Sequence, residues 1–404
     1  MKKILMIGGG VSGKAVASLA NVLNIPCNVV SDAETVNANL DELFNGVDMV
    51  VVSPGVLPTS RLYQAALARS LEVISELELG RRYFAGKCVA VTGTNGKTTT
   101  VELTEFILKH LGLQVAADII KNNINASDMI SVLEVSSFQL EHTYELKAEA
   151  AVLLNVESDH INRYPGGMAE YRSVKERIFR QVPQDKCFYG CSMTGNAVSG
   201  IFEIAGDTLF AGGTELVDLN KTAFAAAHNR ENLLAALSLV QSLLPLNDRL
   251  NELSDILQKF KTGDHRISLV AEKNGVKYID DSKATNPAAV IAAVKSLAPE
   301  PAENIVLIAG GLDKDMDFSA LKAIEKYLRK VIVYGRCGSN IAAVFAGSID
   351  VFNAGTDFAL AVKTAAETAE KGNIVLLSPA AASMDMFKDY KERGDVFARL
   401  ANNL

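Results

Sequence analysis

The stretch Val89-Ala90-Val91-Thr92-Gly93-Thr94-Asn95-Gly96-Lys97-Thr98-Thr99-Thr100 decides the fold of this chain. The apolar run from Cys88 to Val91 predicts a buried strand, and Val101 to His110 has helical spacing. A Gly-rich loop between a strand and a helix points backbone N–H groups and the positive end of the helix dipole at an anion. In such a loop Lys97 would reach the terminal phosphates of a nucleotide, and the Thr98 hydroxyl would take a Mg²⁺ ion.

The full phosphate-loop pattern G-x-x-x-x-G-K-[ST] is not met, because Val91 stands at the position of its first Gly. The core Gly96-Lys97-Thr98 keeps the chemistry of that pattern. The alternative is a plain strand-to-helix turn. Such a turn does not need two Gly, an Asn, a Lys and three Thr together, so we predict a phosphate loop.

The bulk composition is that of an ordinary soluble protein, with 49% apolar and 22% charged residues. A chain of 404 residues is too long for one core, so two or three domains are expected. The net charge of −7 argues against a nucleic-acid groove or an anionic membrane as the main partner. The sequence has no apolar run long enough to span a bilayer, and its five Cys are scattered. We expect reduced thiols and a cytoplasmic location.

The N-terminal residues carry a second Gly-rich loop. Gly8-Gly9-Gly10-Val11-Ser12-Gly13 follows a predicted strand, and Asp32 closes the next strand at about the 20-residue separation of a dinucleotide fingerprint. A third strand, Asp48 to Val52, leads into Gly55. Residues 1–86 are therefore predicted to form a small α/β unit that binds a ligand at its strand ends. The alternative is that these glycines serve only close helix–strand packing.

Polar side chains also follow two strands beyond the phosphate loop. A strand from Met129 to Val135 contains Glu134, and a strand from Ala150 to Val156 leads to His160. Glu134 would supply an oxygen ligand for Mg²⁺, and His160 would complete a second metal position. The alternatives are a solvated strand-end charge for Glu134 and a helix cap for His160.

The last third of the chain opens with a hairpin that turns on Asn274-Gly275, followed by alternating strands and helices. That alternation predicts a parallel sheet with helices on both faces. The predicted fold class is α/β with three domains. Residues 1–86 are Rossmann-like, residues 87–263 form a central parallel sheet like that of phosphate-loop ATPases, and residues 264–404 are again Rossmann-like.

Taken together, these motifs resemble the ATP-dependent Mur ligases, which build the peptide of bacterial cell-wall precursors. The resemblance rests on Gly93 to Thr98, Asp159-His160, His228-Asn229 with Asn232, and His265-Arg266. Further stretches look like the family member that adds D-glutamate to UDP-N-acetylmuramoyl-L-alanine: Glu134 to Leu140, Asp281 to Asn286, Gly310 to Lys314, and Ser378 to Phe387 with Arg393-Gly394. The resemblance covers all three predicted domains in order.

The resemblance implies a set of site residues. The UDP moiety would be held by Val11, Ser12, Asp32 and Gly55, in place of a dinucleotide. ATP would be bound by the loop from Gly93 to Thr99 together with Asn229, Asn232, Arg266 and Asp281. D-Glutamate would be surrounded by Lys283, Thr285, Lys314, Ser383 and Tyr390. Two Mg²⁺ ions would be held by Thr98, Glu134, His160 and a carbamylated Lys175. Catalytic roles would belong to Lys97, His160, Lys175 and Lys283.

The implied reaction is phosphorylation of a carboxylate by ATP, attack of the D-glutamate amine on the acyl phosphate, and release of phosphate. We expect a monomer whose third domain closes on the second. One stretch departs from the family pattern. The usual Gly-Asn-Ile-Gly is replaced by Ala116 to Asn123, in which Asp118, Asn122 and Asn123 are the candidates to take the place of its Asn.

Three other functions remain open from the sequence. A nicotinamide oxidoreductase would use only residues 8–32 and leave Gly96-Lys97-Thr98 unexplained. A nucleotide-binding relative without catalysis is favoured only by the departure near Asp118. Within the family, a ligase for another amino acid or a folylpolyglutamate synthase is the nearest rival.

Overall fold

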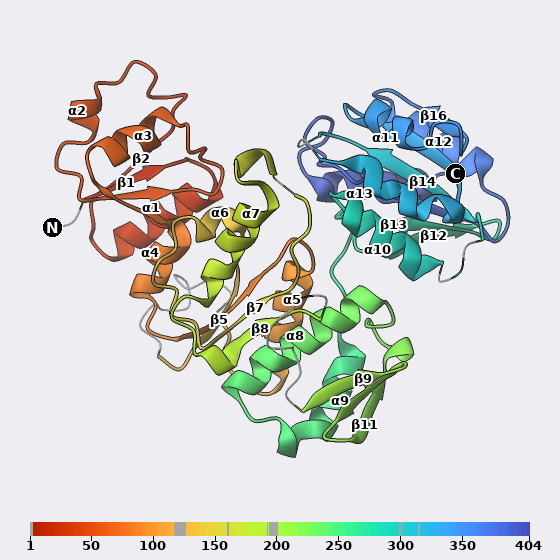
Figure 1. The fold of residues 1–404 in the computed structure, drawn as a ribbon, viewed down its shortest axis with the longest axis horizontal. Helices are drawn as coiled ribbons and strands as arrows, with labels where there is room; N and C mark the ends of the chain where they lie inside the picture. Colours follow the sequence, from red (N-terminus) through yellow and green to blue (C-terminus); the bar gives the residue numbers. More distant parts are fainter. Residues whose placement is uncertain are drawn as a thin grey trace. The chain divides into compact units, whose positions relative to one another are not determined.

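The computed structural model describes residues 3–116, 127–159, 161–191, 193, 201–298, 300, 302–313 and 316–404 (Figure 1). The chain divides into two compact units. The first unit comprises Met1–Val156, Met168–Ala225 and Asn229–Phe260, and the second comprises Glu157–Gly167, Ala226–His228 and Lys261–Leu404. None of the described helices is both long and apolar enough to cross a membrane.

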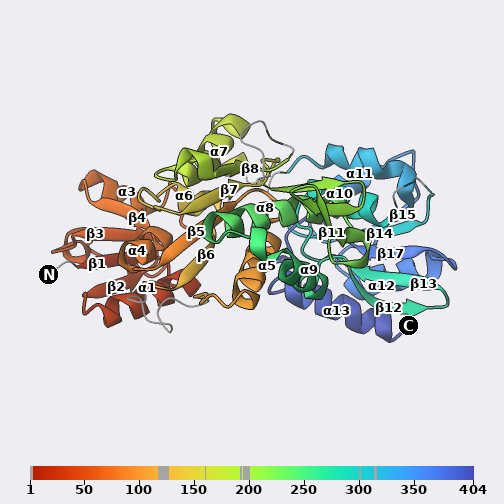
Figure 2. The same ribbon diagram turned by 90° about the horizontal axis from the view of Figure 1, so that it is seen from below.

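The first unit begins with a four-stranded parallel sheet in the order β2-β1-β3-β4, whose strands lie side by side in Figures 1 and 2. Its strands are β1 (Ile4–Ile7), β2 (Cys27–Val30), β3 (Met49–Val52) and β4 (Glu72–Ser75). Alternate side chains point to opposite faces. Leu5 and Val50 pack with α3 (Arg61–Ala68), whereas Ile4 and Met49 pack with α1 (Val11–Val22) and α4 (Glu76–Tyr83). Because both faces are covered, the two central strands, β1 and β3, are apolar throughout. A short helix, α2 (Leu40–Leu43), precedes β3.

A second parallel sheet, in the order β6-β5-β7-β8, carries the predicted phosphate loop. Its strands are β5 (Lys87–Thr92), β6 (Ile130–Glu134), β7 (Ala150–Leu153) and β8 (Cys187–Tyr189). The helices of this region are α5 (Lys97–His110), α6 (Ser137–Leu140), α7 (Gly167–Glu176), α8 (Ala227–Leu243) and α9 (Leu250–Lys259). Since β5 has a neighbour on each side, the loop that follows it lies in the middle of the carboxyl edge, where ligands bind in open parallel sheets.

The remaining strands of the first unit form a small antiparallel sheet. It consists of β9 (Phe202–Ala205), β10 (Thr208–Ala211) and β11 (Thr214–Asp218), with β10 in the middle. Its buried residues Phe202 and Leu209 share one apolar core with α5, α8 and α9. This core fixes α5, and with it the start of that helix at the phosphate loop.

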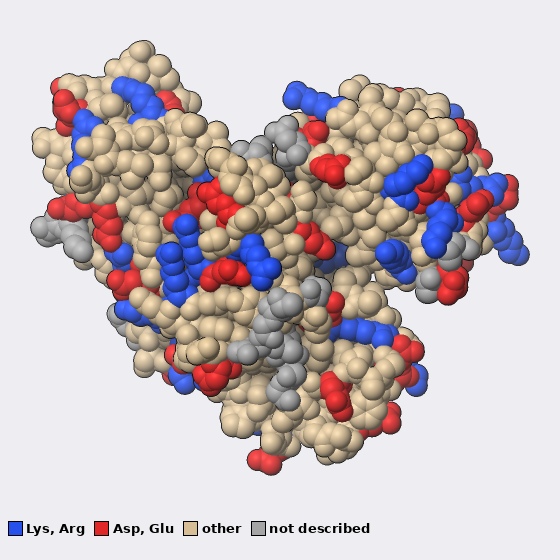
Figure 3. Space-filling model, viewed as in Figure 1, with Lys and Arg blue, Asp and Glu red and all other residues tan. Residues whose placement is uncertain are grey.

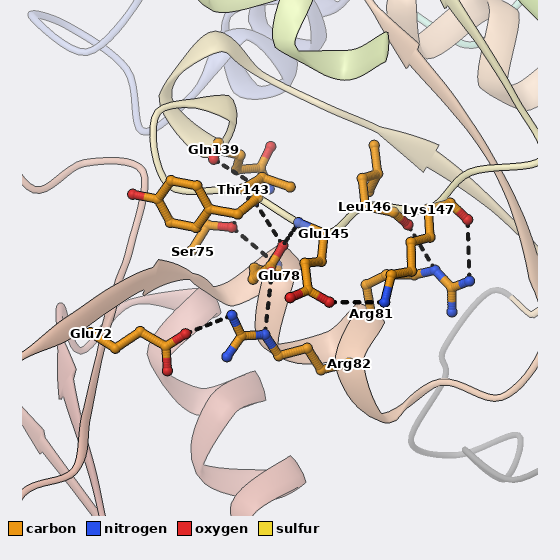
Figure 4. Close-up of polar contacts among 11 residues, drawn as sticks. Glu72, Ser75, Glu78, Arg81, Arg82, Gln139, Thr143, Glu145, Leu146 and Lys147 are labelled. Carbon is orange, nitrogen blue, oxygen red and sulfur yellow. Dashed lines mark hydrogen bonds and ion pairs between the residues drawn. The ribbon is translucent and has the colours of Figure 1, made fainter. Parts of the chain in front are cut away.

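Helix α4 joins the two parallel sheets of the first unit through buried polar contacts (Figure 4). The carboxylate of Glu78, which has no exposed surface, accepts hydrogen bonds from the backbone N–H groups of Tyr144 and Glu145 at 3.0 and 2.9 Å. Its other oxygen lies 3.0 Å from Nε of Arg82. Arg81 donates in turn to the carbonyl of Leu146 at 2.9 Å. The bonds from Glu78 and Arg81 to Tyr144, Glu145 and Leu146 join residues more than 60 positions apart, so they set how the two sheets of this unit meet.

We expect Glu78→Ala to destabilise the first unit by about 3–5 kcal/mol, because it leaves two buried N–H groups and the Arg82 guanidinium without their partner. The midpoint of urea unfolding measures this loss. Glu72→Ala is the matched control, since Glu72 binds the same Arg82 at 2.7 Å but has a side chain 45% exposed. That variant should lose no more than about 1 kcal/mol. Equal losses of unfolding free energy in the two variants would contradict the assignment of Glu78 as the residue that holds the two sheets together.

The second unit is built on a six-stranded sheet in the order β12-β13-β17-β14-β15-β16. Its strands are β12 (Ser268–Lys273), β13 (Val276–Asp280), β14 (Ile305–Gly310), β15 (Leu328–Tyr334), β16 (Val351–Asn353) and β17 (Ile374–Leu377). Only the pair β12 and β13 is antiparallel among these described strands. Its α-helices are α10 (Pro287–Leu297), α11 (Gly338–Val344), α12 (Phe358–Thr368) and α13 (Tyr390–Asn402).

Helices cover both faces of this sheet, as the alternation predicted. Leu307 and Val331 belong to the core that contains residues of α10 and α11, whereas Val306 and Ile332 belong to the core that contains residues of α12 and α13. The predicted hairpin at Asn274-Gly275 is confirmed, with both residues at positive φ. One of the helical segments of this unit, Phe318–Tyr327, is a 3₁₀ helix.

Charged side chains of both signs are interspersed over the face of each unit shown in Figure 3. Several form ion pairs along the chain, such as Lys109 with Glu105 at 2.8 Å and Arg172 with Glu176 at 2.9 Å. Both pairs span one helical turn on exposed helix surface, where such pairs contribute about 0.3–0.5 kcal/mol.

Candidate active site

The loop after β5 is held in shape by side chains from two other elements. Asn155, just beyond β7, accepts hydrogen bonds from the backbone N–H groups of Thr94 and Asn95 at 3.1 and 2.8 Å, and its amide donates to the carbonyl of Asn95 at 3.2 Å. Gly96 has φ +85°, and a Cβ there would lie 2.3 Å from Oδ1 of Asn232. Only glycine fits both the backbone angle and this approach.

Lys97 is the first residue of α5, and its side chain folds back over the loop. Its ammonium donates to the carbonyls of Gly93 and Thr94, each at 2.9 Å. Thr98 follows in the first turn and is half-buried, while Thr99 is buried. The geometry therefore places a cation and a hydroxyl at the N-terminus of a helix, where an anion is stabilised.

Asn229 and Asn232 lie together at the start of α8. The amide of Asn232 lies 3.4 Å from Oδ1 of Asn229, and Thr100 of α5 lies 3.4 Å from Oδ1 of Asn232. Asn229 also donates to the carbonyl of Ala223 at 3.1 Å. The structure thus brings Asn232, a residue from late in the sequence, against the phosphate loop.

Lys175 is one of the largest fully buried side chains, with 1% of its surface exposed. Its ammonium donates to the carbonyl of Gly93 at 2.8 Å and lies 4.7 Å from the centre of the Tyr171 ring. The hydroxyl of Tyr171 lies 3.3 Å from that of Thr94. Helical spacing alone favours a solvated surface charge for Lys175, and that interpretation is wrong: α7 turns this lysine toward the phosphate loop.

The predicted metal ligands are only partly described. Glu134 ends β6 opposite Val91 of β5, one residue before Thr92 and the loop, and its side chain is exposed. His160 lies outside the described residues. Within the described ranges, no three His, Cys, Asp or Glu side chains gather into a metal-binding group. Both metal positions remain predictions.

A cavity of about 550 Å³ lies at the carboxyl edge of the first sheet. Asp32 and Gly55, two of the residues predicted to hold the UDP moiety, both line it. Asp32 is fixed there because Oδ1 accepts the backbone N–H of Leu62 at 3.0 Å. The other two residues predicted to hold the UDP moiety, Val11 and Ser12, lie at the start of α1 and do not line the cavity. Val11 is 88% exposed, and the hydroxyl of Ser12 donates to the carboxylate of Glu76 at 3.2 Å.

The Gly-rich fingerprint at the start of α1 has a packing role as well. A Cβ on Gly13 would lie 2.1 Å from the carbonyl oxygen of Gly8. Glycine is therefore required for α1 to pack this closely on β1, as the packing alternative proposed. Burial raises the pKa of Glu76, whose carboxylate also accepts a hydrogen bond from Gln139 at 3.0 Å.

In the second unit, Asp281 follows β13 and is buried. Its carboxylate accepts a hydrogen bond from Ser378 at 2.7 Å. Burial raises its pKa to about 7, and the nearby guanidinium of Arg266 acts in the opposite direction. Burial and the same guanidinium lower the pKa of His228. Arg266, Asp281 and His228 thus form one electrostatic cluster.

We expect the stability of the protein to fall as pH rises through the range in which Asp281 ionises. Asp has a pKa of about 4 in the unfolded chain and of about 7 in the folded protein. Between these pH values the folded state holds a proton that the unfolded state has lost, so raising the pH favours unfolding. Asp281→Asn keeps the hydrogen-bond acceptor and removes this penalty. The melting temperature of the variant relative to wild type should therefore rise from pH 5 to pH 8. The same difference at both pH values would contradict the prediction.

The predicted amino-acid residues lie on loops at the carboxyl ends of β13 and β17. The ammonium of Lys283 lies 4.1 Å from the centre of the Tyr390 ring, a cation–π contact. Thr285 is half-buried on the same loop, and Ser383 is buried on the loop after β17. Lys314 lies outside the described residues, as do Asp118, Asn122 and Asn123.

Comparison with known proteins identifies two regions of this chain that match known protein domains. Residues 91–191 match the Mur ligase middle domain, and residues 265–381 match the Mur ligase glutamate ligase domain. Proteins named UDP-N-acetylmuramoylalanine–D-glutamate ligase are similar along the whole chain. That of Francisella tularensis subsp. novicida is 32% identical, and that of subsp. holarctica is 33% identical, each match covering 100% of this chain and 96% of the relative.

Solved structures share the fold. The UDP-N-acetylmuramate–alanine ligase MurC of Thermotoga maritima has a TM-score of 0.62 at 18% identity, covering 100% of both chains. The MurF ligase of Thermotoga maritima in complex with ADP has a TM-score of 0.58 at 17% identity, covering 92% of both. A folylpolyglutamate synthase/dihydrofolate synthase with Mn, AMPPNP and L-glutamate has a TM-score of 0.60 at 18% identity, covering 80% of this chain and 93% of its own. The predicted α/β fold is confirmed, whereas the bounds of the three predicted domains stay predictions. The chain belongs to the Mur ligase family.

Proposed function

We propose that this protein is an ATP-dependent ligase that joins D-glutamate to UDP-N-acetylmuramoyl-L-alanine in the synthesis of peptidoglycan precursors. One observation carries the choice of this reaction: the relatives that match the whole chain at 32–33% identity are named for it. The phosphate loop supports the use of ATP, since Lys97 and the start of α5 present positive charge to an anion. An oxidoreductase would leave that loop without a role.

The residues of the loop also fit a divalent cation. The Thr98 hydroxyl and the exposed carboxylate of Glu134 are oxygen donors, which Mg²⁺ prefers. Glu134 ends β6, the neighbour of β5, and Thr98 lies in the first turn of α5, the helix that follows β5. We assign these two residues and His160 to metal binding. When bound, Mg²⁺ would neutralise charge on the nucleotide phosphates. Two structural neighbours were solved with ADP or with Mn and AMPPNP, which supports a metal–nucleotide substrate.

The proposed reaction brings two anions, ATP and the substrate carboxylate, close together. ATP transfers its terminal phosphoryl group to the carboxylate of the L-alanyl residue, and the resulting acyl phosphate is attacked by the amine of D-glutamate with loss of phosphate. Lys97 would stabilise charge on the transferred group, and Lys283 and Arg266 would offer cations to the anionic substrates. Asn155 and Asn232 would hold the loop so that these charges need no rearrangement during the reaction.

Lys175 has the most specific role in the proposal. We assign it a carbamate, formed when the neutral amine adds CO₂ and releases a proton. The carbamate oxygens would serve as Mg²⁺ ligands beside the phosphate loop. The burial of Lys175 supports this assignment, because a buried site disfavours the ammonium and favours the neutral amine that the addition requires.

Phosphate release from ATP tests the proposal. The purified protein would be given UDP-N-acetylmuramoyl-L-alanine with D-glutamate, L-glutamate, L-lysine or meso-diaminopimelate in turn. We expect release with D-glutamate only, because the ammonium group of a diamino acid side chain would be repelled by Lys283. Equal turnover with D-glutamate and a diamino acid would refute the assignment. Phosphate release without any amino acid would show ATP hydrolysis rather than ligation.

A further inference from the structure

Arg393 is a buried cation that forms no ion pair with any carboxylate among the described residues. It lies in the first turns of α13, and none of its surface is exposed. Buried charges in proteins are almost always paired. Yet in the part of the chain that the structure describes, the guanidinium forms hydrogen bonds only to neutral groups: Ser282, Ala381 and Tyr334. Tyr334 stays neutral, because burial raises its pKa to about 12.

These partners lie at the carboxyl ends of three strands of one sheet. Nε donates to Oγ of Ser282 at 2.9 Å and Nη2 to its carbonyl at 2.8 Å, on the loop after β13. Nη1 donates to the carbonyl of Ala381 at 3.1 Å, on the loop after β17, and lies 3.4 Å from the hydroxyl of Tyr334, the last residue of β15. Arg393 therefore clamps the sheet edge at which ligands bind in parallel α/β folds.

The clamped loops carry the residues assigned to the amino acid. Lys283 directly follows Ser282, and Ser383 lies two positions after Ala381. The hydroxyl of Ser282 also donates to the carbonyl of Tyr390 at 2.7 Å, and the Tyr390 ring lies beneath the ammonium of Lys283. Arg393 is thus connected, directly or through Ser282, to the backbone next to Lys283, Ser383 and Tyr390, three residues that we assign to the D-glutamate site.

A close approach of α13 accompanies this clamp. A Cβ on Gly394 would lie 2.1 Å from Nδ1 of His265 and 2.5 Å from Oδ2 of Asp280, two atoms that are themselves 2.6 Å apart. Glycine at position 394 lets the helix approach the end of β13, and this approach brings Arg393 within reach of both loops. A lysine has no planar fork with which to bond both loops at once.

We infer that Arg393 is a positioning residue for the amino-acid substrate. It fixes the loops that bear Lys283 and Ser383, which we assign to a site that takes a dicarboxylate. This inference rests on the proposed function, because that function makes D-glutamate the substrate of these loops. Arg393 does not itself touch the substrate.

Steady-state kinetics of the full-length protein tests this role with Arg393→Lys and Arg393→Met. Arg399→Met is the matched control, since Arg399 is exposed on the same helix. We expect the KM for D-glutamate to rise about tenfold or more in both Arg393 variants. The KM for UDP-N-acetylmuramoyl-L-alanine should stay within about twofold, because its proposed residues lie in a different domain. A purely structural role would lower kcat through loss of folded protein and leave both KM values unchanged.

A milder variant covers the case in which Arg393 variants do not fold. Ser282→Ala removes the hydroxyl that links Nε of Arg393 to the carbonyl of Tyr390, and it leaves the carbonyl contact in place. A selective rise in the KM for D-glutamate in this variant supports the inference. Unchanged KM values for D-glutamate in the folded variants would overturn it. Wild-type protein that does not use D-glutamate would overturn the proposed function and this inference with it.

Discussion

Lys97→Ala is expected to lower kcat by about 10²–10³ while the protein keeps its fold. The ammonium of Lys97 lies between the carbonyls of Gly93 and Thr94 at the start of α5, where it would meet the phosphates of bound ATP. Charge builds up on the phosphoryl group during its transfer, and a fixed cation stabilises that charge more than it stabilises the ground state. The effect should therefore appear in kcat and not only in the KM for ATP.

Phosphate release at saturating substrates measures the loss, and the far-ultraviolet circular dichroism spectrum verifies the fold. Lys109→Ala is the matched control. It removes a lysine from the other end of the same helix, where the side chain is 47% exposed and pairs with Glu105. That variant should keep wild-type activity. A folded Lys97→Ala protein with near-normal turnover would refute the phosphate-loop assignment.

The strand, loop and helix around Gly96 were predictable because their signal is local. Residues 89–100 contain the strand, the loop and the helix start in unbroken order, and the structure places them as the pattern indicated. The alternation of strands and helices after Asn274-Gly275 was equally informative about the C-terminal sheet. These features depend on neighbours in sequence, which is the information that periodicity and turn residues carry.

The supports of the site were not predictable in the same way. Asn155 meets the loop only because β7 pairs with β5, and it lies 60 positions from Asn95. Glu78 meets Tyr144 across 66 positions, and Arg393 meets Ser282 across 111. A single asparagine, glutamate or arginine has no distinctive pattern in one sequence. Tertiary packing alone distinguishes these residues from ordinary surface polar groups.

For Lys175 the sequence pattern and the structure point to different environments. Its helix reads as a polar surface, yet the structure buries the side chain beside Gly93 and Tyr171. Burying a lysine ammonium is unfavourable unless the surrounding groups compensate its charge. Conversion to a carbamate would change the group from a cation that repels Mg²⁺ to an anion that binds it. Because the ammonium and the carbamate carry opposite charges, substitutions of Lys175 can distinguish between them.

We expect Lys175→Ala to lose most of its activity, by about 10² or more, because the oxygen ligands of a carbamate would be gone. Lys175→Arg should be no better, although it keeps a cation in place, since arginine forms no carbamate. Added acetate or formate should restore part of the activity of Lys175→Ala by supplying a carboxylate to the vacated position. Arg172→Ala, on the exposed face of the same helix, should behave as wild type.

Two further measurements separate a carbamate from a buried ammonium. Incubation with ¹³C-bicarbonate should give a carbamate signal in the nuclear magnetic resonance spectrum of the wild type that is missing from Lys175→Ala. Electron density in a crystal with metal and nucleotide should continue three atoms beyond Nζ. An active Lys175→Arg protein would instead show that positive charge is what the site requires. Full activity of Lys175→Ala would remove this lysine from the mechanism altogether, because neither a carbamate nor an ammonium would then be needed for phosphoryl transfer.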